Sequence, residues 1–444
     1  MAVADRPNAP PGIRSTRSLR QPARNPIVTQ WSIRLLYALT FCITLTTTGA
    51  YAQNWSILEY DKDGKVTGVR EGTDDTQRPN GLGEENKRAI EPGEILVVDP
   101  TDTDLAAMES AGFKLMRKDT LSGLEMILAQ FKIPEAMSVP DALEYFARQF
   151  PNLTVGTNDL MDLSGGARVQ TAQAFDYSRN LSGWGIVPDT CGKGIVLGQI
   201  DGFVDENHPA LRGKNLVYKS FLKSGRLPAA ENHGTAVAIL LIGRKLPNYG
   251  GGLLPGAKLY AANIFERRNG KDVGNLAAMI RAVDWLVTQG VQVANLSIAG
   301  QDNVIMRLAI KRSLEKGILL VAAAGNNGAG APPAWPAAHP DTFSVTAIDD
   351  SMHLYQFANQ GKYIDFAAPG VNIPTDTPNG LMAQSGTSFA APFITAMVGL
   401  HLKAGFKLDP DLIRRSMQRY STDLGLAGKD DLFGWGLVRL RPAC

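Results

Sequence analysis

The sequence has little net charge and almost no long apolar runs, and each scarcity excludes a class of protein. The 444 residues carry a net charge of +2, which becomes −3 without the six arginines and one aspartate of residues 1–34. No basic stripe is present to attract nucleic acid. Residues 35–50 form the only long apolar run in the sequence, and the absence of a second one argues against a polytopic membrane protein. A globular protein that does not act on nucleic acid is therefore expected.

Cysteine and metal-ligand patterns are also sparse. Of three cysteines, Cys42 lies in the apolar run, so only Cys191 and Cys444 remain to pair in an oxidising compartment. Spacing alone does not show whether two cysteines are close, and we expect no disulfide. Four histidines lack the spacing of a metal site and are interpreted as structural or surface residues: His208, His339, His353 and His401. No metal and no cofactor is expected.

The amino-terminal segment has the composition of an export signal. Residues 1–34 are basic and rich in Pro, Ala and Ser, residues 35–50 are mostly apolar, and Ala50-Tyr51-Ala52 forms a small-x-small exit. This order predicts a cleavable secretory signal over residues 1–52. The apolar core is short and rich in threonine for a membrane span, and an uncleaved anchor is the alternative. No Arg-Arg pair indicates the twin-arginine route.

Ser388 is the most informative single residue. Glycine and small residues surround it in residues 384–392, just before an apolar run, residues 389–400, that predicts a buried helix. Pro392 lacks the N–H that would bond the Ser388 carbonyl, and a helix tolerates this only near its beginning. Ser388 is thus expected at a helix N-terminus, where free backbone donors favour developing negative charge. From this segment alone, a nucleophile and an ordinary serine N-cap are equally supported.

Three further side chains lie at the ends of predicted strands and helices and are expected to form a shared site with Ser388. Asp201 ends the apolar strand pattern of residues 193–200, and Asn326 follows the strand pattern of residues 318–324. His233 directly precedes the apolar helix pattern of residues 236–243. Because sites assemble at the carboxyl ends of strands in open α/β sheets, these residues are expected to converge. Singly, each is also explained as a turn or capping residue.

The blocks around these four residues resemble the signature segments of subtilisin-like serine proteases, the subtilases. The matching segments are Gln-Ile-Asp201-Gly-Phe, Asn-His233-Gly-Thr, Ala-Gly-Asn326-Asn-Gly and Ser-Gly-Thr-Ser388-Phe-Ala-Ala-Pro. The resemblance covers roughly residues 168–440. The order Asp, His, Ser differs from that of chymotrypsin-like enzymes and α/β-hydrolases, and no Gly-x-Ser-x-Gly elbow surrounds Ser388.

The resemblance implies peptide hydrolysis through an acyl-enzyme. Ser388 would be the nucleophile, His233 the general base and acid, and Asp201 the residue that orients the imidazole. Asn326 would donate to the oxyanion together with the Ser388 backbone N–H. By resemblance, Ser297, Ile298 and Ala299 would pair with substrate backbone, and Ala324 and Ala334 would also contact the substrate. An esterase or acyltransferase with the same triad, and a catalytically impaired binding or scaffold protein, are the alternatives.

Several positions depart from the family pattern. Gly202 and Phe203 follow the aspartate where Ser or Thr and then Gly are usual, and Ala210 stands where the family often has a calcium ligand. Residues 244–250 carry two cations and no carboxylate, so calcium is not predicted there. Ala299 and Ala334 each add a methyl group to surfaces that would touch substrate, which suggests small or medium side chains before the cut bond.

Residues 53–165 are too long for a linker and resemble a subtilase propeptide. Residues 53–93 are expected to be loose, being polar and rich in glycine. From residue 94 to 163 the patterns predict the split βαβ order: strands at 94–98 and 153–158, a hairpin or long strand pair at 121–133, and helices at 102–112 and 139–150. Release is expected within residues 161–175, in the loop at 163–168. An accessory domain that stays attached is the alternative.

The whole chain is therefore expected to be an exported α/β enzyme. Residues 166–444 would form a three-layer subtilisin-like fold with a mostly parallel sheet and helices on both faces, preceded by a small α+β ferredoxin-like domain. Its expected partners are polypeptide substrates and its own propeptide as an intramolecular inhibitor. A monomer with no stable membrane span after signal cleavage is expected.

Overall fold

The computed structural model describes residues 55–60, 66–72, 87–164, 168–170, 176–229, 232–247, 249–377 and 380–444. The expected signal segment, residues 1–52, lies outside these ranges. Residues 1–51 and residues 52–444 are separate units, and only the second is described below. In the described residues, no helix combines the length and the apolarity that crossing a bilayer requires.

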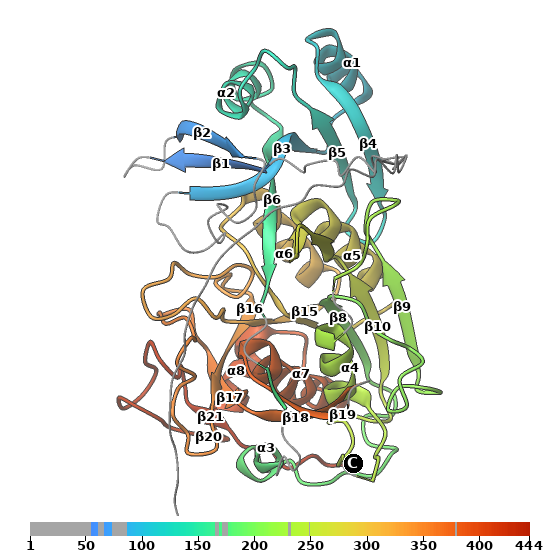
Figure 1. Ribbon diagram of the computed structural model, residues 1–444, viewed down its shortest axis with the longest axis vertical. Helices are drawn as coiled ribbons and strands as arrows, with labels where there is room; N and C mark the ends of the chain where they lie inside the picture. The colour runs from blue at the N-terminus through green and yellow to red at the C-terminus, as the bar shows by residue number, and fades with distance from the viewer. Residues whose placement is uncertain are drawn as a thin grey trace, which may run out of the picture. The chain divides into compact units, whose positions relative to one another are not determined.

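A nine-stranded, mainly parallel sheet forms the centre of residues 166–444, the part expected to be catalytic and called the catalytic region below (Figure 1). The strands β8 (Val196–Asp201), β10 (Lys258–Asn263), β13 (Val293–Leu296), β15 (Leu319–Ala323), β16 (Thr342–Ile348) and β17 (Phe366–Pro369) pair in parallel with their neighbours. The edges are β9 (Leu216–Ser220) on one side and β21 (Leu437–Val438) with β20 (Ser421–Thr422) on the other. The predicted parallel sheet is confirmed.

Helices cover both faces of this sheet, because its strands alternate apolar residues between two cores. One core contains Leu319 and Val321 with the helices α4 (Asn232–Ile242) and α7 (Thr387–Lys403). The other contains Leu320 and Ala322 with α5 (Leu276–Thr288) and α6 (Val304–Glu315). The remaining helices are α3 (Tyr177–Leu181) and α8 (Pro410–Gln418), and β18 (Ile373–Thr377), β19 (Gly380–Gln384) and β7 (Arg168–Gln170) form a small separate sheet.

The described residues between 55 and 164, called the amino-terminal unit below, contain the predicted split βαβ order from β3 to β6. The elements in this order are β3 (Lys87–Val98), α1 (Asp102–Ser110), β4 (Lys114–Leu121), β5 (Met126–Lys132), α2 (Val139–Gln149) and β6 (Thr154–Leu163). The expectation that residues 53–93 are loose is wrong in part. Strands β1 (Trp55–Tyr60) and β2 (Val66–Gly72) pair with each other, and β3 begins at Lys87. Backbone pairing with β3 orders these polar segments, which their composition could not indicate.

Strand β6 belongs to two regions at once. Its first half pairs antiparallel with β3, and its second half pairs with β12 (Lys271–Asn275) and β14 (Ile298–Ala299) of the catalytic region. Figure 1 shows β6 leading from the sheet of β1 to β5 past α5 and α6. The short strand β11 (Glu266–Arg268) extends the same sheet beyond β12. One continuous sheet therefore joins the amino-terminal unit to the catalytic region.

Residues of this unit also contact the starts of two helices of the catalytic region. The Asn158 amide oxygen accepts from the Ala277 backbone N–H at 3.1 Å, in the first turn of α5. Asn303, the N-cap of α6, donates its amide to the carbonyl of Thr157 at 3.2 Å and to the carboxylate of Asp159 at 2.9 Å. Because the first N–H groups of a helix have no partner within it, the Asn158 contact satisfies one such group of α5. Thr157 and Asp159 hold the side chain of Asn303, which itself accepts from the Ile305 N–H of α6.

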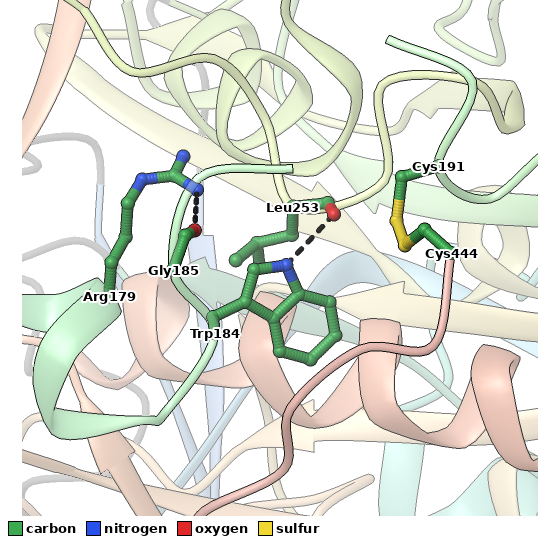
Figure 2. The surroundings of a disulfide bond; sticks show 6 residues. All are labelled: Arg179, Trp184, Gly185, Cys191, Leu253 and Cys444. Carbon is green, nitrogen blue, oxygen red and sulfur yellow. Dashed lines mark hydrogen bonds between the residues drawn. A yellow bond between two sulfur atoms is a disulfide. The ribbon is translucent and has the colours of Figure 1, made fainter. Parts of the chain in front are cut away.

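Cys191 and Cys444 form a disulfide, so the expectation of none is wrong (Figure 2). Their Cα atoms lie 4.9 Å apart, within the range a bridge requires, although 253 residues separate them in sequence. Close by, the Trp184 indole donates to the Leu253 carbonyl at 2.9 Å. Sequence spacing carried no information on this proximity because it arises only from the folded path of the chain.

Candidate active site

Asp201 is the last residue of β8 and lies at the carboxyl end of the central sheet. Its side chain is fully buried. The Gly202 backbone N–H donates to Asp201 Oδ1 at 2.6 Å. The other oxygen, Oδ2, is buried and has no hydrogen-bond partner among the described residues. Gly202 stands where the family pattern has Ser or Thr, so no hydroxyl at this position can bond to the carboxylate.

His233 lies in the first turn of α4 and is 3% exposed. Gly234 allows the helix to approach the aspartate loop, because a Cβ at this position would lie 2.6 Å from the carbonyl oxygens of Gly202 and Phe203. This close approach brings the imidazole against the carboxylate, with His233 Nδ1 at 2.8 Å from Asp201 Oδ1.

Ser388 is the second residue of α7, as the proline position predicts. The N-cap Gly386 has φ +145°, a conformation that L side chains rarely adopt, which explains why glycine precedes the helix. Ser388 is fully buried, and its Oγ lies 2.9 Å from His233 Nε2. The structure thus brings Asp201, His233 and Ser388 into one hydrogen-bonded series, in which the imidazole can accept the proton of the hydroxyl.

Asn326 follows β15 and directs its side-chain amide to a carbonyl of the same chain. Asn326 Nδ2 donates to the carbonyl oxygen of Ser164 at 2.9 Å. The backbone N–H and the hydroxyl of Thr387 each donate to Asn326 Oδ1 at 3.0 Å. Thr387 therefore fixes which end of the amide faces Ser164. The sequence reasoning missed this role, and the only signal for it was that Thr387 precedes Ser388 directly.

The segment ending at Ser164 lies along β14 as an added antiparallel strand. The Ser164 N–H donates to the Ser297 carbonyl at 3.0 Å, and Ile298 pairs with Leu163. Of the other residues expected to contact substrate, Ala299 pairs with Asp162. Ala324 and Ala334 are fully buried. An extended peptide is the ligand that such a strand edge binds.

The residues around Ala210 do not fit a calcium ion. The Ala210 carbonyl accepts from the Arg244 backbone N–H at 2.9 Å. Arg179 is buried and donates to the carbonyl of Gly185 (Figure 2). It also donates to the carbonyl of Gly251 and pairs with Asp176 at 2.8 Å. A hard cation needs several oxygen ligands, and here guanidinium and backbone donors occupy the carbonyls. In the described residues no three His, Cys, Asp or Glu side chains group as a metal site.

Comparison with known proteins agrees with this geometry. The subtilase family profile matches residues 192–436. Minor extracellular protease Epr of Bacillus subtilis (strain 168) is 31% identical over 326 residues, which cover 70% of this chain and 48% of Epr. Subtilisin E of the same strain is 28% identical over 261 residues, or 57% of this chain and 66% of that protein. The chain thus spans about half the length of Epr and just under two thirds of subtilisin E.

A solved structure shows the same fold. Fervidolysin from Fervidobacterium pennivorans, described as a keratinolytic enzyme related to subtilisin, superposes with a TM-score of 0.65 at 22% identity. The superposition covers 79% of this chain and 60% of fervidolysin. With the family profile matching more than half of its length, the chain belongs to the subtilase family.

Proposed function

We propose that this protein is a serine endopeptidase that is made as a self-cleaving, self-inhibited precursor. Ser388 attacks a peptide carbonyl while His233 takes its proton and later delivers that proton to the leaving amine. Asp201 holds the imidazole tautomer and stabilises the imidazolium. Asn326 and the Ser388 backbone N–H stabilise the oxyanion of the tetrahedral intermediate. Membership of the subtilase family and the distances of 2.8 and 2.9 Å around His233 support these roles.

One observation carries the precursor proposal. Asn326 donates to the carbonyl of Ser164, and the Ser164 N–H donates to Ser297. A substrate whose carbonyl faces the oxyanion donor is cut at the bond that follows this carbonyl, so the cut bond is Ser164–Gly165. Before the cut the strand is a substrate, and afterwards it is a bound product that stays paired with β14 and thereby blocks the substrate-binding cleft along this strand. Residues 53–164 are then the propeptide and residues 165–444 the catalytic domain.

Purified active protein tests both parts. A phosphonylating active-site reagent labels the native chain and fails to label a Ser388→Ala variant. Amino-terminal sequencing of the active form reads Gly165. A start near Gln53 would show that the unit stays attached, and absence of labelling would support the scaffold alternative.

The assigned roles predict an order of losses. Ser388→Ala and His233→Ala remove the nucleophile and the base, while Asn326→Ala removes one donor of the oxyanion site. Removing this donor costs about 10²–10³ in turnover, a magnitude carried over from subtilisin of the same family. Turnover of a peptide substrate by each variant therefore falls further for Ser388 and His233 than for Asn326. Equal losses in all three would contradict the roles.

Export is the remaining part of the proposal. The basic leader and apolar core of residues 1–52 support it, as does the name of the extracellular relative Epr. Cell fractionation is expected to find the processed protein outside the cytoplasm, and retention of an intact leader in the cytoplasm would refute export.

A further inference from the structure

We propose that the cleft accepts only a small side chain, that of glycine, alanine or serine, at the residue whose carbonyl is attacked. This inference rests on the proposed endopeptidase function and specifies its substrate class. It is based on the surroundings of Ser164, because the carbonyl of this residue accepts from Asn326 at 2.9 Å.

The register places one methyl group on the side of the cleft that receives the Ser164 side chain. Ile298 pairs with Leu163 and Ala299 pairs with Asp162. In an antiparallel pair, residues two apart along a strand lie on one face, and diagonal neighbours are within reach of larger side chains. Since Asp162 and Ser164 share a face, the methyl group of Ala299 borders the space beside the Ser164 side chain.

A second methyl group closes the same space. Ala299 and Ala334 are both buried and pack against each other as a small cluster of their own. Next to them, Gly300 and Trp335 exchange backbone hydrogen bonds of 2.7 and 3.0 Å. These bonds tie the two walls together, so the walls cannot separate to admit a ring or a branched chain without breaking main-chain pairing.

The space around the Ser164 side chain also offers its hydroxyl no hydrogen-bond partner among the described residues. Ser164 is 3% exposed, and its hydroxyl is buried. A buried hydroxyl without a partner contributes nothing to binding that a methyl group would not. Alanine is therefore expected to serve at least as well as serine.

The position three residues earlier differs, which shows that the restriction is local. Met161 is 1% exposed and packs in the large core that also holds Ile298. Gly300 lies beside it, and even a Cβ at this position would make only an ordinary contact of 3.4 Å with Met161 Cγ. The cleft thus accommodates a long apolar side chain at Met161 and a small one at Ser164.

Quenched peptides of the sequence Leu-Met-Asp-Leu-X-Gly-Gly-Ala, with X as Ala, Ser, Leu or Phe, test the proposal. They are given to the self-processed full chain, with rates divided by the concentration of sites that a phosphonylating reagent labels. Forcing a large group into a packed space costs enough to lower kcat/KM for Phe by about 10- to 100-fold relative to Ala. Cleavage of the Phe peptide at the rate of the Ala peptide would overturn the proposal.

Two variants locate the cause. Ala299→Gly and Ala334→Gly are each expected to raise the Phe-to-Ala ratio of kcat/KM by about tenfold, because each removes a methyl group from the space. Ala261→Gly, at a buried position of β10 away from the cleft, is the matched control and leaves the ratio unchanged. An unchanged Phe-to-Ala ratio in both cleft variants would show that Ala299 and Ala334 do not cause the restriction. If these variants do not fold, the Phe-to-Ala ratio of the native protein tests the proposal by itself. Failure of labelling and of all cleavage would instead refute the proposed function.

Discussion

Replacing Glu91 by alanine is expected to speed the loss of the cleaved amino-terminal unit from the catalytic region. Glu91 lies on β3 and is 5% exposed. Its carboxylate contacts Arg268 at 2.8 and 3.2 Å and accepts from the Asn275 amide at 3.2 Å. Both partners belong to the catalytic region. The substitution therefore acts on the association of the two regions, because Glu91 of the released unit would be exposed to water.

The size of the effect follows from what remains around Arg268. Removing one partner of a buried ion pair costs about 3–5 kcal/mol when the other charge is left uncompensated. Arg268 keeps its second carboxylate, Glu266, so its charge is not left uncompensated. The expected cost is therefore smaller, about 2–3 kcal/mol. If the whole effect appears in the dissociation rate, the release becomes about 30- to 150-fold faster.

The assay follows the onset of peptidase activity after the self-processed protein is diluted. The half-time to full activity reports the dissociation of the unit, and it is expected to shorten in the Glu91→Ala protein. Glu144→Ala is the control, since its pair with Arg148 on α2 is exposed and is worth less than about 1 kcal/mol. Equal half-times for Glu91→Ala and the native protein would refute the reasoning.

The Glu91–Arg268 pair is expected to make the release of the amino-terminal unit depend on pH. Burial alone would raise the pKa of Glu91, but Arg268, Lys223 and the Asn275 amide together outweigh burial and lower this pKa below the ordinary 4.5. A carboxylate with a lowered pKa contributes its full stabilisation above pH 4.5 and loses it as the pH falls through the lowered value. Release is therefore expected to accelerate below this pH in the native protein. Glu91→Ala is expected to weaken the acceleration, and an identical pH profile would count against it.

Three further predictions concern stability, measured by thermal or urea unfolding in the inactive Ser388→Ala background. Replacing Cys191 and Cys444 by serine lowers the free energy of unfolding by about 2–5 kcal/mol, because the bridge constrains the unfolded chain, and an unchanged midpoint would refute this. Arg179→Met lowers it by about 2–4 kcal/mol by stranding buried partners, whereas a loss under 0.5 kcal/mol would show that the guanidinium is dispensable. Burial raises the pKa of Asp159 above 3.8, so its stabilisation is present below that pH and is lost as the pH rises through the raised value. The melting temperature of Asp159→Asn relative to native protein is thus expected to increase with pH, and a constant difference would contradict the shift.

Local sequence patterns predicted the elements that carry the site. The strand before Asp201 and the helices after His233 and Ser388 were predicted because apolar runs and the Pro392 constraint are properties of neighbouring residues. The order of strands and helices in residues 94–163 followed for the same reason. The predicted first strand of the hairpin was misplaced, because β4 begins at Lys114 where charged residues alternate at a largely exposed surface.

Long-range contacts could not be predicted in this way. The pairing of Cys191 with Cys444 depends on the path of the whole chain, and so does the contact of Thr387 with Asn326. The Ser164 carbonyl meets Asn326 across 162 residues, and no local pattern encodes that distance. The resemblance supplied the expected roles of the four site residues, while the geometry supplied the bond at which the chain is expected to cut itself.

Asn158 contacts the first turn of α5, and Thr157 contacts Asn303, the N-cap of α6, and these contacts have a consequence under the proposed processing. Once residues up to 164 have departed, water must replace contacts that helped each helix to start. If the chain is processed as proposed, a mature molecule unfolded by heat or denaturant no longer has these contacts when the two helices form again. Recovery of activity is then expected to be slower than in the full chain, so that the rate of unfolding sets the working life of the mature form.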